Sequence, residues 1–155
     1  MVSMLICTQT ITDNERFATI AKQCVPFNSK EEWKIGCCNN LTDLNRMLST
    51  MERVDLLCID VSQENFLIET KHIRKEYPGL VILIIVSQKQ SPMTYLNPSI
   101  MAASLLMKPI NESIIREVLN EVFEYIRRRD MEKDYFIIEN KVEKVRIEFN
   151  DILLF

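Results

Sequence analysis

The sequence predicts an α/β fold, a doubly wound parallel sheet of five strands with helices on both faces, followed by a short C-terminal antiparallel β segment. Five short apolar runs alternate with segments in which apolar residues recur at helical spacing. Crossovers between parallel strands are right-handed and place helices over the sheet faces. After residue 129 the pattern changes to the alternation typical of antiparallel strands.

The first half of the chain predicts two strands and two helices. Met4–Cys7 is a short apolar run, and Thr12-Asp13-Asn14-Glu15 has the form of a capping box, with Thr12 as the capping residue. The helix that follows is expected to end before Pro26. Trp33–Cys38 is a plausible second strand. The next helix is indicated by an apolar stripe of Leu41, Leu44, Met47, Leu48 and Met51.

The middle of the chain provides the most apolar strands. Val54–Ile59 is the third predicted strand, and Glu64–Tyr77 is the helix after it, closed by Pro78-Gly79. Leu80–Val86 is the most hydrophobic run of the chain. A continuous run of this kind is typical of a strand buried on both faces, so we expect it at the centre of the sheet.

The last third begins with a segment of uncertain type and ends in a long helix. Gln88–Pro98 holds two prolines, which argues against a long helix there, and Ser99–Ala103 is expected to form a short turn of helix. Leu105–Met107 is the fifth strand. Asn111 is expected to cap the final helix. One face of that helix carries Ile114, Ile115, Val118, Leu119, Val122, Phe123 and Ile126.

The chain divides near residue 129 into a domain of residues 1–129 and a segment of residues 130–155. The run Arg127-Arg128-Arg129 is expected to close the final helix, where positive charge complements the helix dipole. The segment holds three alternating apolar stretches, too little for an independent β domain. We expect it to be the start of something larger or to pack against a partner.

Three polar residues stand directly after three of the apolar strands. Asp60 follows the third strand, Ser87 the fourth and Lys108 the fifth. Open α/β sheets place their sites at the carboxyl ends of the strands. A carboxylate, a hydroxyl and an ammonium gathered there could accept, orient and neutralise a phosphoryl group.

Composition excludes several other classes of function. The net charge of −3 gives the whole chain no attraction to nucleic acid, and its two glycines cannot build a phosphate-binding loop. No apolar run is long enough to span a bilayer, so we expect a cytoplasmic protein without a membrane partner. The five cysteines lack the spacing of a zinc site, and we expect buried free thiols. His72, among basic neighbours on a helix, is expected on a solvated face.

These residues resemble a known family. Residues 1–129 resemble a response-regulator receiver domain with flavodoxin-like strand order, through the strand that ends at Asp60, through Ser87 and through Leu106-Met107-Lys108-Pro109. The resemblance implies that Asp60 is the phosphoacceptor of a sensor histidine kinase, and that Ser87 and Lys108 bind the phosphoryl group. It also implies a cis peptide bond before Pro109. Residues 134–155 resemble the opening strands of a LytTR DNA-binding domain, which implies transcription regulation.

The sequence departs from the family at its metal site. Receivers carry an acidic pair after the first strand, and these positions hold Thr8 and Gln9 here. Mg²⁺ requires oxygen ligands, above all carboxylates, and Asp60 would be its single charged ligand. We therefore expect at most weak Mg²⁺ binding through Asp60 and doubt that Asp60 is phosphorylated.

Two interpretations remain open. The first is an atypical two-component response regulator whose output is a change in pairing, including homodimer formation, through the face of its fourth and fifth helices. Residues 130–155 carry a net charge of −3, so DNA binding would require a fuller C-terminal domain. The alternative is a phosphorylation-independent interaction scaffold of receiver fold. No nucleophile–base pair supports an enzyme.

Overall fold

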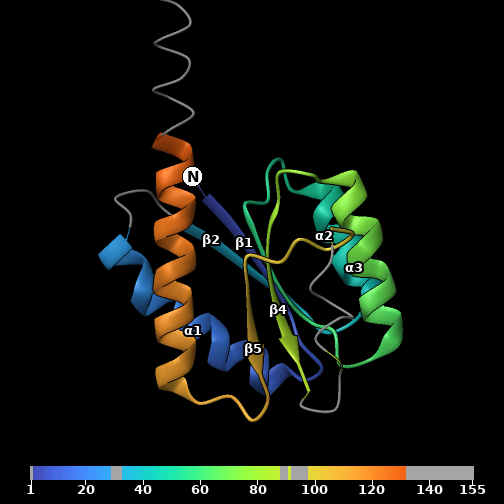
Figure 1. Cartoon of the computed structure of the whole chain (residues 1–155), viewed down its shortest axis with the longest axis horizontal. Helices are drawn as coiled ribbons and strands as arrows, with labels where there is room; N and C mark the ends of the chain where they lie inside the picture. Colours follow the sequence, from blue (N-terminus) through green and yellow to red (C-terminus); the bar gives the residue numbers. More distant parts are fainter. Residues whose placement is uncertain (1, 29–32, 88–90, 92–97, 132–155) are drawn as a thin grey trace, which may run out of the picture.

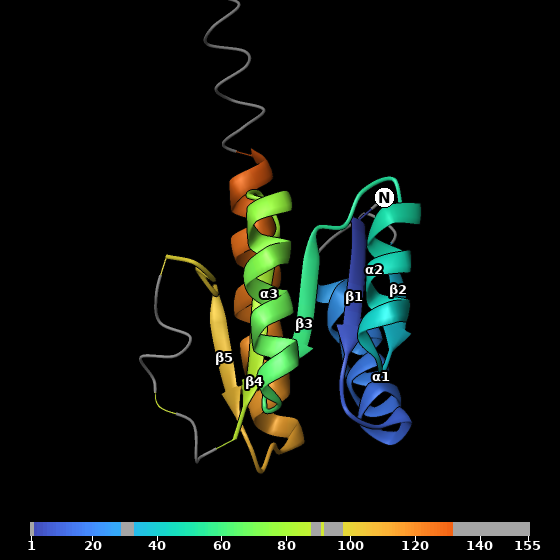
Figure 2. The same ribbon diagram turned by 90° about the vertical axis from the view of Figure 1, so that its right-hand side faces the viewer.

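The computed structural model describes residues 2–28, 33–87, 91 and 98–131. Five parallel strands form one sheet in the order β2-β1-β3-β4-β5, which Figure 2 shows from the side. The strands are β1 (Val2–Cys7), β2 (Trp33–Cys38), β3 (Leu56–Asp60), β4 (Val81–Val86) and β5 (Ser104–Met107). This is the flavodoxin-like order, so the predicted fold class is confirmed.

Helices cover both faces of the sheet. They are α1 (Ile11–Asn28), α2 (Leu41–Thr50), α3 (Glu64–Glu76) and a final helix described over residues 112–131. In Figure 1, α1 and the final helix lie against one face, and α2 and α3 lie against the other. None of the described helices is long and apolar enough to cross a membrane.

The core has two parts, one on each face, because side chains alternate between the faces along every strand. Met4, Ile6 and Cys58 pack with α1 and the final helix. Leu5 and Ile59, their neighbours along the strands, pack with α2 and α3. Every residue of β4 is buried, as the continuous apolar run predicts.

The start of α1 differs from the prediction. Thr10, rather than Thr12, is the capping residue, since its hydroxyl oxygen accepts a hydrogen bond of 3.1 Å from the backbone N–H of Asp13. The helix also continues beyond Pro26 to Asn28. A proline in the last turn removes one helical hydrogen bond, and the helix ends two residues later instead of before it.

The final helix begins as predicted, and it is described up to Met131, one residue beyond the run Arg127-Arg128-Arg129-Asp130 that is expected to close it. The side-chain oxygen of Asn111 caps it by accepting from the backbone N–H of Ile114 at 2.8 Å. Asp130 and Met131 are still helical. The arginine run therefore lies within the helix, and Arg128 pairs with Glu124 one turn earlier at 2.8 Å. The β segment predicted over residues 130–155 lies outside the described residues from residue 132 onward.

The segment before β5 is described only in part. Most of the region in which a long helix was doubted, residues 88–90 and 92–97, lies outside the described residues. Residues 98–100 form a turn, where a short turn of helix was expected. Met101 follows with a φ of 49°, in the left-handed region that side chains other than glycine rarely adopt.

Candidate functional site

The carboxyl edge of the sheet brings Asp60 and Lys108 into direct contact. The register pairs Asp60 of β3 with Ile85 of β4, and Val86 of β4 with Met107 of β5. The strands therefore end side by side, and Lys108 reaches back over β4. Its Nζ lies 2.5 Å from Oδ2 of Asp60.

The Asp60 carboxylate is buried and uses both oxygens. The residue is 1% exposed. Oδ2 pairs with Lys108, and Oδ1 accepts a hydrogen bond of 2.9 Å from the backbone N–H of Ser62. The Lys108 side chain is 35% exposed. The pair therefore neutralises and occupies the carboxylate that the sequence singles out.

Ser87 lies at the same edge, directly after the last residue of β4 and partly buried. The backbone N–H of Lys108 donates to the carbonyl oxygen of Val86 at 2.8 Å, which fixes the two chain ends next to each other. The peptide bond between Lys108 and Pro109 is cis, as the resemblance implies. The structure thus brings all three predicted residues to one edge and joins Asp60 to Lys108.

Thr8, the first residue after β1, uses its side chain for hydrogen bonds within this edge. It is 2% exposed, and its hydroxyl oxygen lies 2.8 Å from both Oδ1 of Asn14 and the carbonyl oxygen of Thr10. The backbone N–H of Thr8 also donates to Oδ1 of Asn14, at 3.1 Å. Thr8 therefore ties the end of β1 to the first turn of α1.

Asn14 is the residue of this edge that the sequence analysis missed. Its amide nitrogen donates to the carbonyl oxygen of Cys38 at 2.9 Å, so one buried side chain joins the ends of β1 and β2 to α1. The sequence does contain a pattern that could have identified Asn14, because this residue lies at helical spacing in the apolar stripe of Phe17 and Ala21. A polar residue in such a stripe is expected to have hydrogen-bond partners inside.

Gln9 and Ser62, at the carboxyl edge of the sheet, each have a buried polar side-chain atom without a hydrogen-bond partner among the described residues. Gln9 follows Thr8 past the end of β1, and Ser62 lies two residues after Asp60. Within the described part of the chain, the buried side-chain nitrogen of Gln9 and hydroxyl of Ser62 have no hydrogen-bond partner. Both are neutral groups, so they add no charge that could hold a cation.

The donor set does not fit Mg²⁺. A magnesium site needs several oxygen ligands in octahedral geometry and at least one accessible carboxylate. At this edge the carboxylate of Asp60 is occupied by Lys108 and Ser62, and the two residues directly after β1 are the neutral Thr8 and Gln9. Among the described residues, no three His, Cys, Asp or Glu side chains are grouped as metal ligands.

All five cysteines are free thiols in the structure. Cys7, Cys24, Cys38 and Cys58 are buried, as predicted, but Cys37 is exposed, contrary to the expectation of buried thiols. Cys7 and Cys38 are partners in the register of β1 and β2. A hydrogen bond with Cys38, together with burial, raises the pKa of the Cys7 thiol, and the same bond lowers the pKa of Cys38. His72 is exposed, as predicted.

Comparison with solved structures shows which fold this is. The response regulatory domain of mrkE from Klebsiella pneumoniae matches with a TM-score of 0.65 and 15% identity, over 82% of this chain and 99% of that one. The REC domain of AraT, a response regulator from Geobacillus stearothermophilus, matches with a TM-score of 0.60 and 20% identity, over 84% and 99%. The chain has the receiver-domain fold.

The same receiver fold occurs in proteins with other names. A putative pilus assembly-related protein from Burkholderia pseudomallei matches with a TM-score of 0.59 and 15% identity, over 79% of this chain and 90% of that one. No protein-family model matches the sequence, and a search of curated proteins finds no match. At these identities the likeness concerns the fold, and function must be argued from the site.

Proposed function

We propose that the protein is an atypical response regulator, a receiver-type module of two-component signal transduction that signals without Mg²⁺-dependent phosphorylation of Asp60. The observation that carries the proposal is the contact of 2.5 Å between Asp60 and Lys108 at the carboxyl edge of a receiver fold. The trio of Asp60, Ser87 and Lys108 supports descent from a phosphoryl-accepting site. The missing acidic pair supports the loss of its metal chemistry.

The physical argument concerns charge. Phosphoryl transfer to a carboxylate brings two anions together, and metal ions normally neutralise that charge. Here a single fixed cation, Lys108, already neutralises Asp60, and Thr8 is committed to Asn14. A sensor histidine kinase remains the partner class that fits the fold, with recognition by surface contact rather than by transfer to Asp60.

An interaction scaffold outside two-component signalling is the second candidate. The burial of Asp60 and its ion pair favour it, because they turn the ancestral site into a structural link between β3 and the loop after β5. Transcription regulation is a further proposal, and it rests on the resemblance of residues 134–155 to a LytTR domain. Homodimer formation through the face of the fourth and fifth helices belongs to the response-regulator proposal, and DNA binding would require a fuller C-terminal domain.

A magnesium titration with a matched variant tests the proposal. Gln9→Asp adds a second carboxylate next to the end of β1 and leaves the contact between Thr8 and Asn14 in place. We expect calorimetry to detect no Mg²⁺ binding to the wild-type site. We expect Gln9→Asp to bind Mg²⁺ at least about tenfold more tightly than the weakest binding that the measurement detects. Wild-type Mg²⁺ binding that disappears in Asp60→Asn would contradict the proposal.

A further inference from the structure

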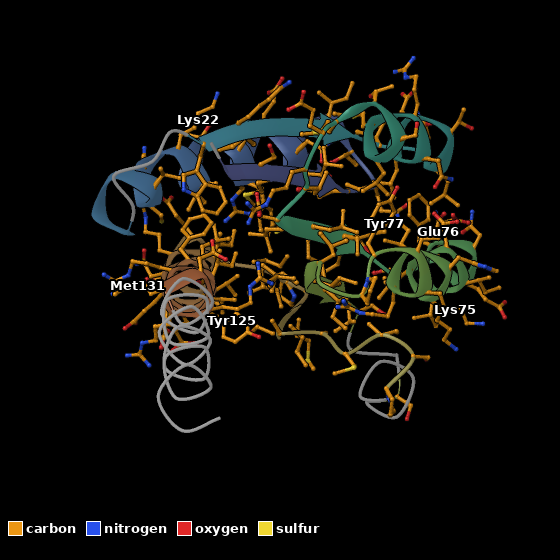
Figure 3. All side chains as sticks on the ribbon, turned by 90° about the horizontal axis from the view of Figure 1, so that it is seen from above. Lys22, Lys75, Glu76, Tyr77, Tyr125 and Met131 are labelled. Carbon is orange, nitrogen blue, oxygen red and sulfur yellow. The ribbon has the colours of Figure 1, made fainter. Side chains whose placement is uncertain are left out.

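Two buried thiols lie side by side at the carboxyl ends of β1 and β2. Cys7 is the last residue of β1 and Cys38 the last of β2, and the two are partners in the register of these parallel strands. Both belong to the core on the face of α2 and α3. Figure 3 shows the two faces, with Tyr77 on this side of the sheet and Lys22 and Tyr125 on the other. The two thiols share a hydrogen bond.

The geometry of the pair fits a disulfide bond. Neighbouring strands of a sheet lie about 4.8 Å apart. Disulfides typically join residues whose Cα atoms are about 4.4 to 6.8 Å apart. Register partners on adjacent strands fall within this range, and Cys7 and Cys38 also direct their side chains to the same face. A disulfide between them can therefore form within the folded sheet.

The strand ends that carry the pair are held in place by one buried side chain. Thr8, which follows Cys7, contacts Oδ1 of Asn14 through its hydroxyl group and its backbone N–H. The amide nitrogen of Asn14 donates to the carbonyl oxygen of Cys38 at 2.9 Å. Asn14 thus binds at both cysteines, and this fixes the strand ends in the register in which the thiols meet.

The other three cysteines lie on the opposite face of the sheet. Cys24 and Cys58 belong to the core under α1 and the final helix. Cys37 precedes Cys38 in β2, and its sulfur lies 3.9 Å from the carbonyl oxygen of Asn14 in α1. Side chains alternate between the faces along a strand, so the exposed Cys37 thiol points away from the pair.

Cys38 is the member of the pair that lies nearer to solvent. It ends β2, the outermost strand of the sheet, and the exposed residues Asn39 and Asn40 follow it. Cys38 is 6% exposed, whereas Cys7 is fully buried. The hydrogen bond with Cys7 lowers the pKa of the Cys38 thiol, and the thiolate is the form that reacts with oxidants. An oxidant little larger than water therefore meets Cys38 first.

We propose that Cys7 and Cys38 form a redox-active pair, which hydrogen peroxide oxidises to a disulfide bond between β1 and β2. The Cys38 thiolate attacks one peroxide oxygen, the O–O bond breaks, and the leaving hydroxide takes up the proton that Cys38 released, giving water. The Cys7 sulfur then attacks the sulfenic acid of Cys38, and its proton leaves with the hydroxyl group as a second water molecule. The inference uses neither Asp60 nor Lys108, so it is independent of the proposed function.

Peptide mapping of the folded full chain tests the pair. The protein is treated with hydrogen peroxide in native buffer, the remaining thiols are alkylated in denaturant, and trypsin digests the chain without reduction. We expect a linked species of the tryptic peptides 1–16 and 35–46, which a dithiol reductant separates again. Fragmentation of the linked species between Cys37 and Cys38 assigns the bond in the wild type itself.

Two variants of neighbouring residues provide the matched comparison. We expect Cys37→Ser to keep the linked peptides and Cys38→Ser to lose them, with circular dichroism showing that both variants are folded. We also expect Cys24 and Cys58 to be oxidised at least about tenfold more slowly than the pair, because both are buried and burial raises their pKa.

Several results of the same mapping would overturn the inference. A bond between Cys37 and Cys38, a bond between two copies of the chain, or over-oxidation of Cys38 while Cys7 remains alkylatable would each do so. So would the absence of any linked peptide. Oxidation of Cys58 as fast as the pair would also contradict it, because the oxidant would then be reacting with the unfolded chain.

Discussion

The Asp60 carboxylate decides what this receiver fold can do. Its two oxygens are held by the Lys108 ammonium and the Ser62 backbone N–H, and the residue is almost wholly buried. Burying a charge is costly unless the charge is paired. Lys108 is therefore expected to be a structural requirement of the fold, whatever its role in the function proposed above.

Removing the lysine tests that requirement. We expect Lys108→Met to lower the free energy of unfolding by about 3 kcal/mol, because it leaves Asp60 buried without a partner. This value is at the lower end for a buried pair since the Lys108 side chain is one-third exposed. Urea unfolding measures the loss. The double variant Asp60→Asn with Lys108→Met should regain most of it, because both charges are gone.

A small loss of unfolding free energy in Lys108→Met would lead to a different conclusion about the ion pair of Asp60 and Lys108. If Lys108→Met costs less than about 1 kcal/mol, the contact behaves like a solvent-exposed ion pair. The carboxylate would then be open to ligands, contrary to our account of the site.

Individual residues of the site differ in how well the sequence predicts them. Asp60, Ser87 and Lys108 follow three apolar runs, and parallel pairing alone brings them to one edge. The role of Asn14 depends on contacts with Thr8 and Cys38, which come from two different strands. No local pattern specifies such contacts, although a polar residue in an apolar stripe indicates that they exist.

At the scale of elements, the strands are predicted better than the helix ends. Buried parallel strands are continuous apolar runs, so all five strands were found, and β2 was predicted with its observed bounds Trp33–Cys38. The start of α1 was misplaced because a threonine lies three residues before an acidic residue twice, at Thr10 and at Thr12. In the structure the backbone N–H of Asn14 donates to the carbonyl oxygen of Thr10 at 3.2 Å, so the first helical turn already begins there.

The corrected cap of α1 gives a direct comparison of two threonines. Thr10→Ala should lower the free energy of unfolding by about 1 kcal/mol, because it removes the acceptor for the backbone N–H of Asp13. Thr12→Ala, two residues on and already within the helix, should change it by less than about 0.5 kcal/mol. Thermal or urea unfolding of both variants checks this, and the reverse order would restore Thr12 as the capping residue.

In the whole molecule, the sheet separates two cores, one on each face. Its strands end at a carboxyl edge and begin at an amino edge. The carboxyl edge holds the neutralised pair of Asp60 and Lys108, and a groove of about 890 Å³, lined by residues that include Gly79 and Arg129, lies at the amino edge. The cores also contain buried thiols, which link overall stability to pH. Burial raises the pKa of the Cys58 thiol above its ordinary value, because the thiolate would be desolvated.

The buried Cys58 thiol makes the protein less stable as the pH rises above the pKa of a free thiol. Below the unfolded pKa of about 8.5, Cys58 is protonated in both states and its contribution to stability is complete. As the pH rises further, the unfolded chain loses the proton while the folded chain keeps it, so stability falls. We expect this thiol alone to reduce the free energy of unfolding by about 1.4 kcal/mol per pH unit above that pKa.

Urea unfolding of wild type and Cys58→Ala between pH 8 and 10.5 measures this slope. The variant should start less stable, because it leaves a small cavity, and should lose stability less steeply as the pH rises. Parallel slopes for the two proteins would show that the Cys58 thiol ionises equally in both states.

In the function proposed above, the Asp60 site is closed to metal-dependent phosphorylation. The most direct measurement is the intact mass of the full chain after incubation with acetyl phosphate and Mg²⁺, with Asp60→Asn as the control. Our account predicts no phosphoryl adduct that distinguishes wild type from Asp60→Asn. An adduct on wild type that is labile to hydroxylamine and absent from Asp60→Asn would contradict it and would show a working phosphoacceptor.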